Sequence, residues 1–139
     1  MQQREIRKLY KRRPKFGKVA NAENYLLQYI FVEALARRIW YYYRNRSVIK
    51  KKMSHAAVPL DVLLRACRYY DIKVNVKVLR LIFDSSLRKR GEKSARNLRN
   101  ELVHSWNEKD KNESVNRLPE FSSAFKKFVD AVCNDLFER

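Results

Sequence analysis

Apolar residues recur along much of the chain at intervals of three and four, the spacing of one face of an α-helix. The longest such segment begins after Asn21, a residue type that favours helix N-caps, and we expect it to run to about Arg46. Pro59 suits the first turn of a second helix. The apolar stripe of that helix is Leu60, Leu63, Leu64 and Cys67.

One stretch fits two structures. Between Ile72 and Val78 apolar and polar residues alternate as in a strand, yet helical spacing continues from Val78 to Leu87. A lone strand would have no sheet to join. We therefore expect a short extended link and then a helix, with Asn75 as its cap and Gly91 at its end.

The remainder of the chain predicts two more helices. One covers residues 92–106, the polar segment 107–116 is a loop, and Pro119 opens the last helix, which has the cleanest amphipathic stripe. The fold class is therefore all-α: a compact antiparallel bundle of four to five helices, forming one domain over residues 19–139. Residues 1–18 are expected to form a flexible basic arm.

Composition excludes several classes. The chain of 139 residues suits one domain, and with 2 Gly and 3 Pro it lacks the turns of an all-β fold. No long apolar run predicts a membrane span, and the basic N-terminus lacks the apolar segment of a secretory signal. Cys67 and Cys133 are isolated, so no zinc site and no cofactor are expected, and the pattern favours a reduced, cytoplasmic protein.

Charge changes this picture, because the formal net charge is +17. Residues 1–52 carry 15 Lys/Arg and 3 Asp/Glu, a net charge of +12. Such a field attracts polyanions, and nucleic acid is the first candidate partner. The candidate RNA-binding residues are Arg12, Arg13, Lys15, Arg44, Arg46, Lys50, Lys51, Lys52 and Arg96.

The predicted helix over residues 92–106 has two distinct faces. At about 100° per residue, the core stripe is Ala95, Leu98, Leu102 and Trp106. The other face carries Arg99, Asn100, Val103 and His104. Asn100 and His104 are one turn apart, so their side chains can form a hydrogen bond.

These residue types suit cleavage of an RNA phosphodiester. The 2′-hydroxyl must lose a proton as it attacks the adjacent phosphorus, and histidine exchanges protons near neutral pH. The transition state gains negative charge, which a fixed guanidinium can stabilise. Single-stranded RNA is favoured because in-line attack needs a flexible backbone, and no metal is required.

The run from Arg99 to His104, Arg-Asn-Glu-Leu-Val-His, resembles the Arg-polar-x-x-x-His motif of the HEPN superfamily (higher eukaryotes and prokaryotes nucleotide-binding domain). The small all-α bundle with its motif late in the chain is similar as well. The resemblance implies a metal-independent endoribonuclease that leaves 2′,3′-cyclic phosphate ends. Arg99 and His104 would be the catalytic pair, with Asn100 supporting them. It also implies a homodimer with the active site at the interface, and a role as a toxin or an antiviral (abortive infection) effector.

At one position this chain differs from a subgroup of the family. One subgroup of the family has His-x-Tyr, whose tyrosine is modified by a partner antitoxin, whereas this chain has Trp106 at that position. The identity of any antitoxin or larger complex therefore stays open.

Val103 would be an unusual exposed residue in a monomer, and burial against a symmetric copy would explain it.

Other classes of function stay open. The main alternative is a non-catalytic RNA-binding or scaffold subunit of a larger assembly, favoured by the +12 charge of residues 1–52. A membrane-surface protein is weaker, because the first long helix has an apolar face wide enough for a core.

Overall fold

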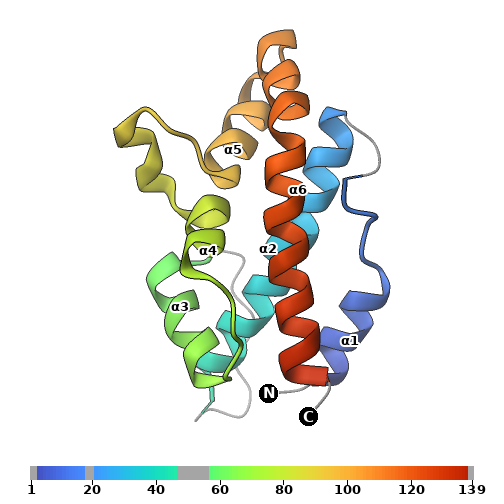
Figure 1. Ribbon diagram of the computed structural model, residues 1–139, viewed down its shortest axis with the longest axis vertical. Helices are drawn as coiled ribbons and strands as arrows, with labels where there is room; N and C mark the ends of the chain where they lie inside the picture. Colours follow the sequence, from blue (N-terminus) through green and yellow to red (C-terminus); the bar gives the residue numbers. More distant parts are fainter. Residues whose placement is uncertain (1–2, 18–20, 47–56, 138–139) are drawn as a thin grey trace.

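The computed structural model describes residues 3–17, 21–46 and 57–137 (Figure 1). These residues form helices and links with no β-strand among them, which confirms the all-α prediction. The elements are α1 (Gln3–Lys11), α2 (Ala22–Arg44), α3 (Leu60–Tyr69), α4 (Val76–Phe83), the 3-10 helix η1 (Ser85–Arg90), α5 (Ala95–Ser105) and α6 (Glu108–Phe137).

The two longest helices, α2 and α6, form the centre of the molecule, and the other helices pack around them (Figure 1). Aromatic rings fill the space between them: the ring centroid of Tyr25 lies 5.9 Å from that of Phe121, and Tyr29 lies 6.3 Å from Phe125. All four side chains are buried. Because aromatic rings remove large apolar areas from water, these contacts contribute much of the core.

Residues 3–17 are not the separate flexible arm that the basic sequence predicts. Gln3–Lys11 form α1, which packs on α6 and α2, and Ile6 is fully buried. In the link that follows, the ring of Phe16 packs against that of Phe31 in a T-shaped pair, with the ring centroids 6.2 Å apart. The few apolar residues of this segment lie on one side, and the many charges around them conceal that stripe in the sequence.

The ambiguous segment is resolved as predicted, up to the position of Gly91. Residues 72–75 form an extended link, and the side chain of Asn75 accepts a hydrogen bond from the backbone N–H of Lys77 to begin α4. Asp84 then ends α4 and caps η1. Gly91, in the left-handed conformation with φ of 74°, ends η1 rather than α4.

The predicted loop at residues 107–116 is wrong. Helix α6 begins at Glu108, and Pro119 lies inside it. Asn107 starts the helix through its side-chain oxygen, which accepts from the backbone N–H of Asp110 at 2.8 Å. The first turns look polar because most of their side chains face water or pair with α5 and the link before it.

Helix α5 is shorter than its predicted range and has different ends. Ser94 and Asn97 form a capping box, in which each side chain accepts a hydrogen bond from the other's backbone N–H. At the other end Trp106 adopts the left-handed conformation, with φ of 47°, and is 39% exposed. Trp106 is therefore not part of the core stripe, because its backbone has already left the helix.

None of the helices built from described residues has the length and apolar character that crossing a bilayer requires.

Substitution of Ser94 tests how strongly the capping box holds the fold. We expect Ser94→Ala to lower the free energy of unfolding by about 1–2 kcal/mol, because the first turn of α5 loses its cap in a buried place. Urea denaturation measures this loss. Ser123→Ala, at an exposed position of α6, is the control and should stay close to the wild type. Equal stability of the two variants would contradict this role of the box.

Candidate functional site

The candidate site lies on the outer face of α5, which three contacts hold in place. The hydroxyl of Tyr25 on α2 donates a hydrogen bond to the carbonyl oxygen of Ala95 at 2.6 Å, within the protein interior. Leu98 and Leu102 are fully buried on the inner face. The capping box fixes the first turn. The direction in which the opposite face points is therefore set by buried contacts.

On that outer face the structure brings Arg99 and Asn100 together. The guanidinium of Arg99 donates through Nη1 to the amide oxygen of Asn100 at 2.9 Å, and both side chains are half-buried. The Nε of Arg99 is buried and has no hydrogen-bond partner among the described residues. Because the amide holds one edge of the guanidinium, Arg99 is partly pre-oriented, as recognition of an anion requires.

His104 lies one turn beyond Asn100 on the same face, and its side chain is exposed. No hydrogen bond joins Asn100 to His104, and the amide oxygen of Asn100 accepts from Arg99. Within the described part of the chain the imidazole has no hydrogen-bond or ion-pair partner. It is therefore open to a ligand approaching α5. Val103 beside it is 51% exposed.

Arg96 does not have the role that the sequence predicts. Its guanidinium donates to the carbonyl oxygen of Val58 at 2.6 Å and lies 5.2 Å from the ring centroid of Phe83. It also lies close to the Tyr29 hydroxyl, whose pKa burial and then Glu33 raise, while Arg96 opposes them. Arg96 is thus a structural contact between α5 and its neighbours. A charge on a helix surface does not reveal such a partner.

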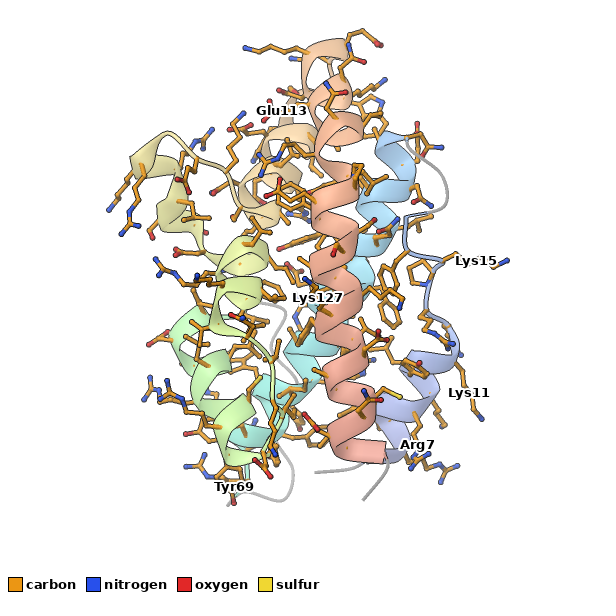
Figure 2. The ribbon with its side chains drawn as sticks, in the orientation of Figure 1. Arg7, Lys11, Lys15, Tyr69, Glu113 and Lys127 are labelled. Atoms are coloured by element: carbon orange, nitrogen blue, oxygen red, sulfur yellow. The ribbon has the colours of Figure 1, made fainter. Side chains whose placement is uncertain are left out.

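The other predicted RNA-binding residues lie away from the α5 face. Lys15 is in the link after α1, which passes on the other side of α6 from α5 (Figures 1 and 2). Arg12 and Arg13 precede it, and the Arg13 guanidinium lies 4.0 Å above the ring of Tyr10. Arg44 and Arg46 are at the end of α2 remote from Tyr25. The other predicted contacts, Lys50, Lys51 and Lys52, are outside the described residues.

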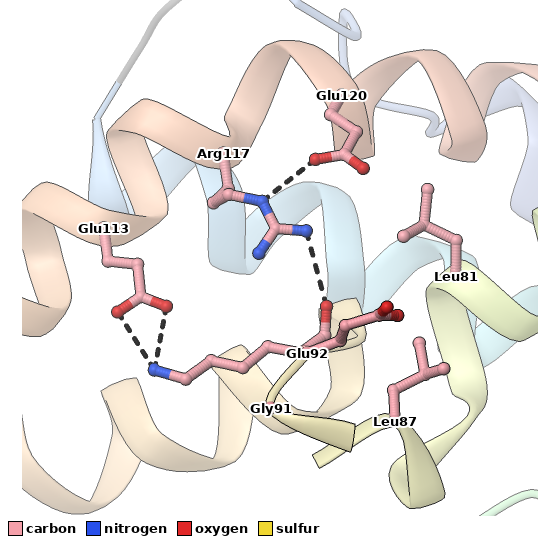
Figure 3. Close-up of a pocket in the computed structure, with 8 residues that line it drawn as sticks. Leu81, Leu87, Gly91, Glu92, Glu113, Arg117 and Glu120 are labelled. Carbon is pink, nitrogen blue, oxygen red and sulfur yellow. Dashed lines mark hydrogen bonds and ion pairs between the residues drawn. The ribbon is translucent and has the colours of Figure 1, made fainter. Parts of the chain in front are cut away.

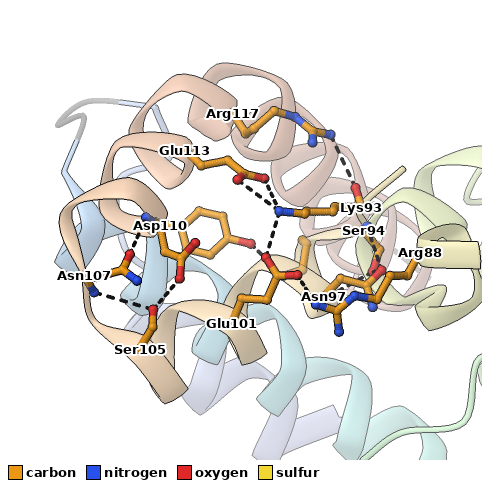
Figure 4. Close-up of polar contacts among 12 residues, drawn as sticks. Arg88, Lys93, Ser94, Asn97, Glu101, Ser105, Asn107, Asp110, Glu113 and Arg117 are labelled. Atoms are coloured by element: carbon orange, nitrogen blue, oxygen red, sulfur yellow. Dashed lines mark hydrogen bonds and ion pairs between the residues drawn. The ribbon is translucent and has the colours of Figure 1, made fainter. Parts of the chain in front are cut away.

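No sequence pattern predicts the ion network that joins α5 to α6 and to the residues before α5 (Figure 4). The ammonium of Lys93 lies 2.8 Å from carboxylate oxygens of both Glu101 and Glu113, and Arg88 pairs with Glu101 as well. Burial alone would lower the pKa of Lys93, but its two carboxylate partners outweigh burial and raise it. Lys93 therefore carries its charge at neutral pH. Only the unexpected start of α6 brings Glu113 here, so no pattern in the sequence predicts the network.

Three carboxylates of this region are close enough to hold a metal ion: Glu101, Asp110 and Glu113. However, the Lys93 ammonium already lies between two of them, and Ser105 donates to Asp110 (Figure 4). A cation between Glu101 and Glu113 would meet this positive charge at close range. The donor set therefore fits an internal ion network better than a metal centre.

A cavity of about 400 Å³ opens on the other side of this network, between α4, α6 and the link before α5 (Figure 3). Its lining is Leu81, Leu87, Gly91, Glu92, Lys93, Glu113, Arg117 and Glu120. Arg117 pairs with Glu120 at 2.9 Å and donates to the Lys93 carbonyl oxygen. The cavity includes none of the three predicted catalytic residues, and its cations already have partners.

Comparison with known proteins places the chain in no family. No family model matches it, and neither the curated proteins nor the solved structures contain a significant match.

The ion network gives a stability prediction. We expect Lys93→Met to lower the free energy of unfolding by about 1–3 kcal/mol at pH 7, because Glu101 and Glu113 lose the cation that they share in a partly buried place. Chemical denaturation measures the effect. Lys109→Met, at an exposed position near the start of α6, is the control with little expected change. A Lys93→Met protein as stable as that control would contradict the network's contribution.

Proposed function

We propose that this protein is a metal-independent endoribonuclease that cleaves single-stranded RNA at the outer face of α5. One observation carries the proposal: Asn100 holds the Arg99 guanidinium at 2.9 Å, while His104 is exposed one turn further along the same face. An oriented cation and a proton-transfer group thus lie five residues apart on one helix. The resemblance of these residues to the HEPN motif supports the same conclusion.

In the proposed reaction His104 takes the proton of the RNA 2′-hydroxyl. The 2′-oxygen forms a bond to phosphorus, and the bond from phosphorus to the 5′-oxygen breaks. The leaving oxygen takes up a proton, which gives a 5′-hydroxyl on one product and a 2′,3′-cyclic phosphate on the other. Arg99 stabilises the charge that develops on the phosphoryl oxygens, and Asn100 positions Arg99.

A homodimer would complete this site. Base and acid must act on opposite sides of the phosphorus, and the described α5 face offers a single histidine. A symmetric second copy would bring its own His104 to the other side. Val103 would then be buried at the contact.

The surface of α2 next to α5 supports a dimer contact. Glu33 of α2 and Arg96 of α5 both interact with the Tyr29 hydroxyl, so they mark the seam between the two helices. Helical spacing places Ile30 on the same side of α2 as Glu33, as it places Val103 on the same side of α5 as Arg96. Ile30 is 54% exposed. Exposed apolar side chains on both sides of one seam are typical of a protein contact.

In the cell the protein would act in the cytoplasm as a toxin or an antiviral effector, as the resemblance implies. Free thiols at both Cys67 and Cys133 are compatible with a reducing compartment.

The second candidate function is that of a non-catalytic RNA-binding or scaffold subunit. The specific observation in its favour is the position of the basic residues, since Lys15 lies on the other side of α6 from α5 and Arg44 lies at the end of α2 remote from Tyr25. Such a protein would bind RNA without cutting it.

Cleavage of a labelled single-stranded RNA in EDTA separates the two candidates. We expect the wild type to cut the RNA and His104→Ala to be about 100-fold slower or worse, because it lacks the proton-transfer group. His55→Ala, which removes the chain's other histidine, is the matched control and should keep the wild-type rate. Equal rates for His104→Ala and His55→Ala, or no cleavage by the wild type, would overturn the catalytic role of the α5 face.

Sedimentation analysis tests the homodimer. We expect a wild-type dimer, and we expect Val103→Asp to be a folded monomer that no longer cleaves RNA, because a carboxylate would be buried at the contact. Val76→Asp, at another exposed apolar position, should remain a dimer. A wild-type protein that stays monomeric at high concentration while it cleaves RNA at its full rate would contradict the dimer.

A further inference from the structure

A cluster of tyrosine rings lies at the end of the bundle remote from α5, where α2 ends and α3 ends (Figure 2). The ring centroids of Tyr43 and Tyr69 are 5.5 Å apart, and Tyr70 meets Tyr69 edge-on at 5.0 Å. Tyr69 is 59% exposed, so a large part of its ring faces water. Tyr43 and Tyr70 are partly buried against the core, so Tyr69 is the ring of the cluster that presents most of its surface to water.

Arginine side chains accompany these rings. The Arg46 guanidinium lies 4.2 Å from the ring centroid of Tyr43 and 5.2 Å from that of Tyr69. Arg44 lies 5.5 Å from the ring of Trp40. Arg44, Arg46 and Arg68, the last of which precedes Tyr69, are all exposed. A flat guanidinium above an aromatic ring keeps its charge and still offers a second face for stacking.

Exposed aromatic rings beside cations are what a single strand of nucleic acid needs. Bases stack on the rings irrespective of sequence, and the cations meet the phosphates between them. A duplex would not fit this chemistry, because its bases already stack on one another.

We propose that Tyr43, Tyr69 and Arg46 form a base-stacking platform for single-stranded RNA, with Arg44 and Arg68 at the flanking phosphates. The platform is a binding site separate from the α5 face. Its action requires RNA to be the partner but does not require the protein to cleave it.

The separation of the two surfaces sets the length of RNA that can use both. Tyr25, which contacts Ala95 of α5, and Tyr43 are 18 residues apart on α2, which corresponds to about 27 Å along the helix axis. An RNA that contacts the platform and the α5 face of one protomer must therefore extend along the bundle. A short oligonucleotide could occupy one surface at a time.

The test measures RNA binding by fluorescence anisotropy in the His104→Ala background, so that no cleavage can interfere. The probe is an unstructured RNA of about 20 nucleotides. We expect an added Tyr69→Ala to weaken binding about 5- to 100-fold, the usual loss when one stacking ring is removed. Tyr69→Phe should restore the affinity, because stacking needs the ring and not the hydroxyl. Val76→Ala, at an exposed position of α4, is the control for a truncated surface residue.

Two further measurements, at different salt concentrations and with a duplex probe, distinguish stacking on Tyr69 from attraction by charge. The loss from Tyr69→Ala should be the same factor at low and high salt, whereas Arg44→Ala should reduce the salt dependence of binding. Duplex RNA of the same length should show no effect of Tyr69→Ala.

Any of three binding results would overturn the platform: Tyr69→Ala binding within twofold of the Val76→Ala control, Tyr69→Phe as weak as Tyr69→Ala, or an equal loss for duplex RNA. The Tyr69→Ala protein should also keep the thermal unfolding midpoint of its background. A large fall in that midpoint, together with weak binding, would assign Tyr69 to the fold instead. If the wild type binds RNA through the platform but cuts nothing, the proposed cleavage fails and the platform stands.

Discussion

The hydrogen bond from the Tyr25 hydroxyl to the Ala95 carbonyl oxygen is the contact on which the candidate site most depends. It joins the two helices inside the protein, and the Tyr25 ring packs against Phe121 of α6 as well. Burial raises the pKa of Tyr25 well above its ordinary value, so the hydroxyl remains a donor at any physiological pH. Because the first turn of α5 is fixed in this way, the turns that follow must present Arg99 and His104 outward.

The basic side chains of this molecule fall into two groups with different roles. Some cations serve the fold, such as Lys93 between two carboxylates and Arg96 against Val58 and Phe83. Others are exposed at the ends of α1 and α2 and are not part of the buried core. A surplus of the second kind explains how a protein with net charge +17 can bury an aromatic core and still have a strongly basic surface, which the proposed RNA binding requires.

Local signals in the sequence were enough to predict two of the helix starts that have a side-chain cap. Asn21 and Asn75 both start their helices as expected. In each case the amide oxygen accepts a hydrogen bond from a backbone N–H of the first turn, just before an apolar stripe. The sequence also predicted the buried positions Leu98 and Leu102, and hence the outward face with Arg99 and Asn100. What it could not predict depends on tertiary partners. Ile6 is buried only because α1 packs against α6. The polar first turns of α6 are helical although their side chains form no apolar stripe.

In the proposed function the α5 face cleaves RNA by attack of the 2′-oxygen, and the chemical ends of the products report on that step. Incubation of the wild-type protein with single-stranded RNA in EDTA, followed by mass analysis of the fragments, identifies those ends. We expect a 2′,3′-cyclic phosphate on the upstream fragment and a 5′-hydroxyl on the downstream one. Fragments with 3′-hydroxyl and 5′-phosphate ends, or an RNA left intact, would contradict it.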